Sequence, residues 1–219
     1  DGVMMVWDTR SREDQYVHSL KANFIAAEYA HPYIAILFGN NEIAFIDGEN
    51  YTQGSSIKKK PIGYNEPIIS MTFSDKNIDF LALGDIFGGI KILKRRKDKD
   101  DIMELSLIHS RDPLIEKDYH PFFEYKAHCM QIPKEIKEKH RLNPKIDKIV
   151  FPVKALNFNP KNPSILASAG GEGSIYIADV DKEIGTENKL FIKNSRECQF
   201  TGKFTHMKYN EEGRWLISV

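Results

Sequence analysis

The stretch IISMTFSDKNIDFLALGDIFGGIKI at residues 68–92 returns, without a gap, as VKALNFNPKNPSILASAGGEGSIYI at residues 153–177. In this alignment Phe73 falls on Phe158. Each copy has an alternating apolar strand, a polar turn, a small apolar strand, a Gly-rich turn and a second alternating strand. This repeated antiparallel unit predicts an all-β repeat architecture, in which function usually lies on the surface that the repeats jointly present.

Partial copies of the unit surround these two. Residues 1–8, DGVMMVWD, have a turn glycine, an alternating strand and a terminal Trp-Asp, while residues 204–219 open a fresh copy. Units of about 40–45 residues that end in Trp-Asp are typical of WD-repeat β-propellers, which close with ~4–8 blades. The sequence predicts about three complete blades plus parts of two. We expect residues 1–219 to be part of a single, larger propeller domain, with residues 95–149 as an insertion or long loops within it.

Smaller elements follow from the local pattern. Residues 16–50 are predicted to form one blade, and residues 102–110 and 122–128 to form further strands. Residues 134–141 have a helical composition and lie between two prolines, so any helix there is short.

Composition excludes several classes of protein. Lys plus Arg and Asp plus Glu number 31 each, so no global field draws the chain onto nucleic acid or anionic lipid. The two cysteines, Cys129 and Cys198, lack a metal-binding spacing and predict a reduced intracellular protein. No apolar run approaches the ~20 residues needed to span a bilayer, so no membrane association is expected.

The sequence predicts no enzymatic activity, cofactor or metal. His128 and Cys129 are neighbours in a predicted strand, so their side chains point to opposite faces and cannot share a proton directly. The turn at residues 170–173 lacks the helix and lysine of a phosphate-binding loop, and the seven histidines lack metal-site spacing. The basic runs at residues 58–60 and 91–99 lack interleaved aromatic residues, which favours solvated turns over nucleic-acid contacts.

Several segments, in consistent order, resemble one branch of WD-repeat proteins. They are FEYKAHC at residues 123–129, FPVKALNFNP at 151–160 and AGGEGSI at 169–175, with LGDIFGGI at 83–90 and WDTRS at 7–11. The branch contains the spindle-checkpoint propellers of the Bub type and the mRNA-export propellers of the Rae/Gle type. Its pattern here is a Phe-Lys-Cys-His-Arg strand, a variable loop, a Tyr-Pro-Val-Asn-x-Ile or Tyr-Ala-Val-Asn-x-Ile strand and a Gly-Ser-Asp-Gly turn.

The resemblance implies a seven-bladed, non-enzymatic scaffold that binds a GLEBS segment of a partner protein across one face. The partner is a checkpoint kinase in one branch and a nucleoporin in the other. Lys126, His128 and Cys129 occupy the stretch that contacts the peptide, and Cys129 replaces an arginine expected to pair with a GLEBS acid. A cysteine cannot offer the planar bidentate fork of arginine. Either another base, such as Lys126 or Lys134, takes this role or the segment is bound differently.

The checkpoint branch also reads phosphorylated Met-Glu-Leu-Thr repeats of a kinetochore scaffold. Lys161 stands where that branch keeps a basic phosphate contact, and Lys182 lies near the place of a second. A solvated turn lysine is an equal alternative for Lys161, because Lys76 occupies the same position in the first copy.

We favour the checkpoint branch because Phe-Pro-Val at residues 151–153 is closer to its strand. Residues 7–11 and 31–32 look more like the export branch. The leading hypothesis is a spindle-assembly-checkpoint adaptor in the nucleus and at the kinetochore, with a cytoplasmic pool and without sequence-specific nucleic-acid binding. The alternatives are a nuclear-pore-associated mRNA export factor and a WD-repeat subunit of another complex.

Overall fold

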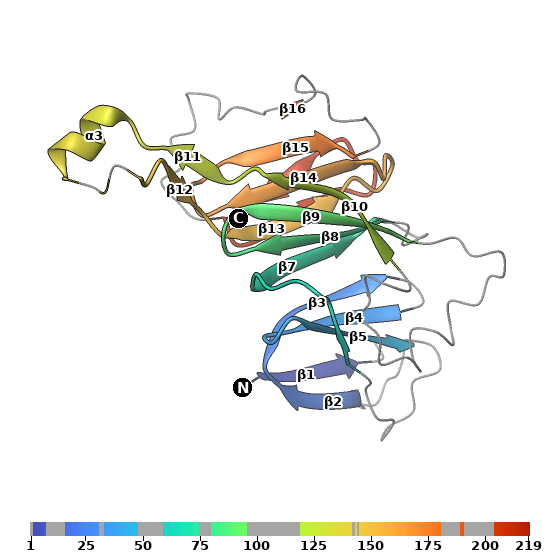
Figure 1. The fold of residues 1–219 in the computed structure, drawn as a ribbon. Helices are drawn as coiled ribbons and strands as arrows, with labels where there is room; N and C mark the ends of the chain where they lie inside the picture. The colour runs from blue at the N-terminus through green and yellow to red at the C-terminus, as the bar shows by residue number, and fades with distance from the viewer. Residues whose placement is uncertain are drawn as a thin grey trace.

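The chain folds into antiparallel sheets that follow one another along the sequence (Figure 1). The structure is a computed structural model, and it describes residues 2–7, 16–30, 33–47, 59–74, 80–95, 119–141, 143, 145–180, 189–190 and 204–219. Within these ranges α3 (Lys134–Lys139) is the single helix, as the sequence predicted, and no helix is long and apolar enough to cross a membrane.

Three of the sheets have four strands each and form complete blades. The first contains β3 (Phe24–Ala30), β4 (Tyr33–Phe38), β5 (Glu42–Asp47) and β6 (Lys60–Pro61). The second contains β7 (Ile68–Phe73), β8 (Phe80–Asp85), β9 (Gly89–Arg95) and β10 (Tyr119–Lys126). The third contains β13 (Val153–Phe158), β14 (Ile165–Gly170), β15 (Ile175–Asp179) and β16 (Lys189–Leu190).

Pairs of strands complete the architecture. They are β1 (Gly2–Trp7) with β2 (Tyr16–Ala22), β17 (Met207–Tyr209) with β18 (Leu216–Ser218), and β11 (Cys129–Gln131) with β12 (Lys148–Val150). The first two pairs belong to further blades, while β11 and β12 form a hairpin around α3. The all-β prediction of three complete blades and parts of two is confirmed.

The repeat places Phe73 and Phe158 in equivalent buried positions. Phe73 pairs with Leu81 across β7 and β8, and Phe158 pairs with Leu166 across β13 and β14. The first strand of each blade also has a bulge at the same place, next to its first residue; the bulges lie between Phe24 and Ala26, Ile68 and Ser70, and Val153 and Ala155.

The turn between the second and third strands of each blade contains a residue with left-handed backbone conformation. Its φ is 58° at Asn41, 80° at Gly88 and 78° at Gly173. Glycine adopts this conformation without strain, and asparagine is among the residues that tolerate it best. The three blades therefore share one turn geometry despite their different sequences.

Apolar side chains fill the space between successive blades. Between the second and third blades, the ring centroids of Phe80 and Phe158 lie 6.3 Å apart. These residues belong to a cluster with Ala82, Ile90, Ile92, Val153, Leu156, Leu166 and Val180. Because each full blade presents apolar side chains on both sheet faces, burial on its neighbours holds the blades side by side.

Two predicted boundaries differ from the structure. Residues 16–50 were expected to form one blade, but β2 pairs with β1 of the preceding blade, and the next blade begins with β3. One residue separates β2 from β3, so no polar turn marks the change of blade. The strand predicted at residues 122–128 falls in β10, which begins at Tyr119, ends at Lys126 and pairs with β9 with a register shift between Pro121 and Phe123. The strand expected at residues 102–110 lies outside the described residues.

Candidate peptide-binding face

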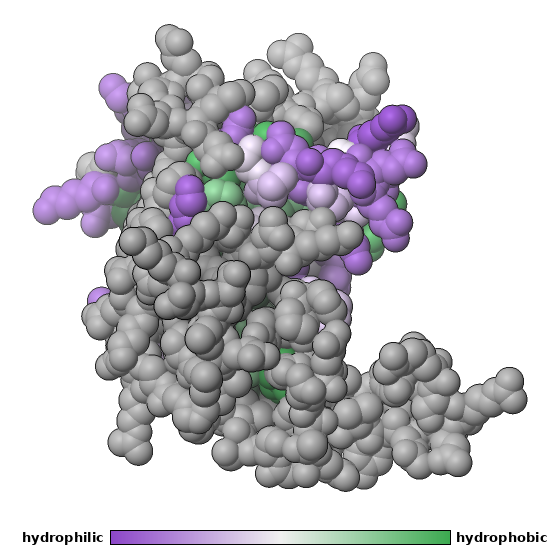
Figure 2. All heavy atoms as spheres, turned by 90° about the vertical axis from the view of Figure 1, so that its right-hand side faces the viewer, coloured by the Kyte–Doolittle hydropathy of each residue, from purple (hydrophilic) through white to green (hydrophobic). Residues whose placement is uncertain are grey.

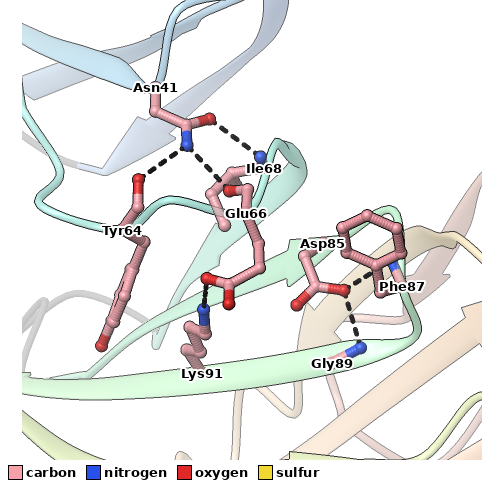
Figure 3. A network of polar contacts seen from close by, with 8 residues as sticks. All are labelled: Asn41, Tyr64, Glu66, Ile68, Asp85, Phe87, Gly89 and Lys91. Carbon is pink, nitrogen blue, oxygen red and sulfur yellow. Dashed lines mark hydrogen bonds and ion pairs between the residues drawn. The ribbon is translucent and has the colours of Figure 1, made fainter.

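Loops from successive blades are hydrogen-bonded to one another at one end of the strands. In the β4–β5 turn, Asn41 Nδ2 donates to the carbonyl oxygens of Tyr64 at 3.0 Å and Glu66 at 2.7 Å (Figure 3). Its Oδ1 accepts from the Ile68 amide at 2.9 Å. One asparagine side chain thus fixes the loop that leads from the first blade into the second.

The β8–β9 turn is fixed in a similar way. Asp85 Oδ1 accepts from the amides of Phe87 at 2.7 Å and Gly89 at 2.8 Å (Figure 3). The Ile86 amide donates to Pro67 O at 3.2 Å, which joins this turn to the preceding loop. The Phe87 side chain remains 44% exposed.

A buried lysine supports the same region. Lys91, on β9, is 3% exposed, and its Nζ lies 2.6 Å from Glu66 Oε2 and 4.0 Å from the centre of the Tyr64 ring (Figure 3). A buried ammonium group needs a counter-ion or comparable partners, and here it has a carboxylate and an aromatic face. The charge of Lys91 therefore anchors the loop between the first and second blades.

Hydrogen bonds continue the connection to the third blade. Gly88 O accepts from the amides of Ala127 at 3.2 Å and His128 at 3.3 Å. The Phe151 amide donates to His128 O at 2.9 Å. In the β14–β15 turn, the Gly171 amide donates to Pro152 O at 3.2 Å. We call this joined surface the loop face; it comprises residues 39–41, 62–67, 86–88, 127–128, 151–152 and 171–174.

His128 lies inside the protein beneath this face. Its side chain has no exposed surface; Nδ1 lies 2.5 Å from Glu172 Oε1, and Nε2 lies 3.0 Å from Ser168 Oγ. The edge of Tyr176 packs on its ring, with centroids 4.8 Å apart. Burial, followed by the nearby Glu172 carboxylate, raises the pKa of Tyr176. The imidazole thus ties the loop after β10 to the third blade.

This placement differs from the predicted peptide contact of His128. Both ring nitrogens are engaged within the chain, so the residue positions the loop and offers no free group to a ligand. A signal for this role exists in the repeat: Ser168 and Glu172 are polar where the first copy has Leu83 and Phe87. Polar residues that replace apolar ones at two related positions indicate a buried polar partner from elsewhere in the chain.

The other predicted site residues lie at both ends of the blades. Lys126 ends β10, where its backbone pairs with Gly89, and Cys129 is a partly exposed cysteine at the start of β11. Lys161 is exposed in the β13–β14 turn, at the other end of the third blade. Lys182 lies outside the described residues. The roles of these four residues remain predictions.

A six-residue strand separates Lys161 from the loop face. At ~3.3 Å per residue, β13 spans about 20 Å, so the two predicted sites lie at opposite ends of the blade. Figure 2 shows the molecule from the side opposite α3, and most described side chains visible toward the top of this view are hydrophilic. A peptide would need about six extended residues to reach from the loop face to Lys161.

The hairpin β11–α3–β12, residues 129–150, projects away from the blades and is called the arm below (Figure 1). Its two sides are linked by a hydrogen bond of 2.9 Å from the Ile132 amide to Asp147 O and by an ion pair between Lys137 and Asp147. The hydrogen bond that Asp147 accepts from Lys137 is the main cause that lowers the pKa of the Asp147 carboxyl. The arm is therefore braced internally.

Comparisons with known proteins agree with this architecture. The chain is similar over its whole length to the crystal structure of the Cps50 (Swd1) β-propeller domain of Myceliophteria thermophila, with a TM-score of 0.55 and 14% identity. The fold is a WD-repeat β-propeller. The chain covers 56% of that domain, so it spans little more than half of the solved propeller.

A short segment of the chain also matches a known protein in sequence. Over 38 residues, or 17% of this chain, the sequence is 50% identical to the protein transport protein SEC31 of Phaeosphaeria nodorum, of which it covers 3%. No family model matches the chain. The structural likeness supports the WD-repeat β-propeller fold.

Proposed function

We propose that this chain is part of a scaffold that binds a GLEBS-type peptide segment of a partner protein across the loop face. The observation that carries the proposal is the hydrogen-bonded continuity of this face, from Asn41 through Gly88 to Gly171. A fixed backbone loses little conformational entropy when a peptide binds, so more of the contact energy appears as affinity. Phe87 adds an exposed aromatic side chain, and phenylalanine is among the residue types enriched at protein–protein interfaces.

Within this proposal the chain acts as a spindle-assembly-checkpoint adaptor in the nucleus and at the kinetochore, with a cytoplasmic pool. Its partners are a checkpoint kinase and a phosphorylated kinetochore scaffold. The Asn159 side chain accepts hydrogen bonds from the amides of Lys161 at 2.9 Å and Asn162 at 3.0 Å, which fixes the turn that presents Lys161. A phosphothreonine carries a charge of about −1.5 to −2 and forms strong charge-assisted hydrogen bonds with such a group.

Calorimetry with two kinds of peptide tests this proposal. A GLEBS peptide is expected to bind the wild-type chain, and a Met-Glu-Leu-Thr peptide is expected to bind only when its threonine is phosphorylated. Lys161→Glu should abolish the preference for phosphate, while Lys154→Glu, at an exposed lysine near the other end of β13, should preserve it.

The outcomes separate the candidate functions. Equal affinity for both forms of the Met-Glu-Leu-Thr peptide would remove the checkpoint role. GLEBS binding without phosphate recognition would favour an mRNA export factor whose partner is a nucleoporin. If neither peptide binds, the chain is a WD-repeat subunit of another complex.

A further inference from the structure

The arm exposes apolar side chains on a sheet too small to bury them. Ile146 is 49% exposed and Ile149 is 42% exposed, and Ile136 of α3 and Val150 are exposed as well. Among the described strands, β12 has only β11 as a neighbour. An isolated two-stranded hairpin is marginally stable in water, and an open strand edge is a template for further pairing. The arm therefore has the properties of an incomplete sheet.

The hydrogen-bond pattern identifies which backbone groups lie on the open edge of β12. The Ile132 amide donates to Asp147 O, and the Phe151 amide donates to His128 O. In an antiparallel pair, the residues that exchange hydrogen bonds alternate with residues whose N–H and C=O groups point outward. The amides and carbonyls of Lys148 and Val150 therefore point away from β11.

The charge of the arm restricts what can bind there. Six basic residues stand against three acidic ones, although the whole chain is neutral, and Asp147 is already paired with Lys137. The basic residues are Lys134, Lys137, Lys139, Arg141, Lys145 and Lys148, and the acidic residues are Glu135, Glu138 and Asp147. Two copies of this arm would repel each other, whereas an acidic segment would be attracted.

We propose that the arm binds an extended, acidic and partly apolar segment of a partner protein, which adds a third strand along β12. Backbone hydrogen bonds to Lys148 and Val150 supply affinity and fix the register. Alternating acidic and apolar side chains of the segment then meet Lys148 on one face and Ile149 on the other, since neighbouring strand residues face opposite ways. This binding site is separate from GLEBS recognition on the loop face.

Two labelled peptides probe the edge: one alternates glutamate and valine, and the other alternates lysine and valine. Only the acidic peptide is expected to bind, with an affinity that falls as salt concentration rises. Hydrogen exchange should show the Lys148 and Val150 amides exchanging rapidly in the free chain and becoming protected when the acidic peptide is added. Amides already protected in the free chain would show that another segment covers the edge and would overturn the proposal.

Paired variants separate backbone pairing from side-chain effects. Val150→Pro removes an outward amide, which an edge strand tolerates, and should abolish binding, while Val150→Ala keeps the amide and should retain most of it. Reversing both Lys145 and Lys148 to Glu should weaken binding about tenfold or more. Lys161→Glu, at the other end of the blade, serves as the control and should leave binding of the acidic peptide unchanged.

The proposal is overturned if both peptides bind equally, if Val150→Pro binds as well as Val150→Ala, or if the free chain dimerises through the arm in sedimentation. Circular dichroism of each variant checks that it is folded. Binding of the GLEBS peptide should survive the Lys145 and Lys148 reversals. A failure of the arm site can thus be distinguished from a failure of the loop face.

Discussion

Replacing Gly88 with alanine tests whether the loops form one connected surface. Gly88 has a φ of 80°, which is unfavourable for a residue with a Cβ atom. A Cβ built there would overlap His128 O and lie 3.0 Å from Phe151 O. Both atoms belong to the backbone at the base of the arm and cannot rotate away.

Two costs combine in Gly88→Ala. The left-handed conformation costs about 1–2 kcal/mol for an L-residue, and overpacking against fixed atoms adds about 1–3 kcal/mol. We therefore expect the free energy of unfolding to fall by about 2–5 kcal/mol. Gly171→Ala is the matched control, because its Cβ would lie 3.5 Å from Pro152 Cδ at ordinary contact distance. This change should cost less than about 0.5 kcal/mol.

Urea unfolding of the wild type and both variants measures these differences. Hydrogen exchange adds a local measurement, because the amides of Ala127 and His128 donate to Gly88 O and should exchange faster in Gly88→Ala. If Gly88→Ala unfolds at the same urea concentration as Gly171→Ala, and both amides stay protected, then Gly88 does not contact the backbone of residues 127–128 and 151.

Three further predictions concern stability and binding. Phe158→Ala should lower the free energy of unfolding by about 3–5 kcal/mol, whereas Phe87→Ala, at an exposed ring, should change it by less than about 0.5 kcal/mol; equal unfolding curves would contradict the packing of the blades. Burial raises the pKa of Glu28 to about 7 from 4.5, so the folded chain holds this proton longer than the unfolded chain. The stability of the wild type relative to Glu28→Gln should therefore fall as pH rises between these values, and a pH-independent difference would be inconsistent with a desolvated Glu28 carboxyl. Cys129→Arg should tighten GLEBS binding about tenfold or more, as measured by calorimetry, and an unchanged affinity in a folded variant would remove position 129 from the binding site.

The sequence predicted the fold well because the repeat is long and free of gaps. The same shift in residue number aligns Phe73 with Phe158 and Gly88 with Gly173. In the structure the two phenylalanines occupy equivalent strand positions, and the two glycines occupy equivalent turn positions. Alternating apolar residues and turn glycines act over a few residues, so they can be recognised without knowing what lies across the sheet.

The candidate site was harder to predict because its contacts join distant segments. His128 and Glu172 are 44 residues apart, and no local period connects them. The loops around Asn41 and Gly88 likewise acquire partners only after the blades are side by side. A lone histidine has no pattern of its own, and the family resemblance implied that this one contacts the peptide.

The contact between Phe151 and His128 determines how the chain tolerates changes in the arm. The hydrogen bond between the Phe151 amide and His128 O closes the arm at its base. The spacing of the blades on either side therefore does not depend on how many residues the arm contains. Lengthening a flexible loop costs only about 0.6 kcal/mol for each doubling. This place in the chain is therefore one where insertions can accumulate, diversify and be exchanged without loss of the propeller.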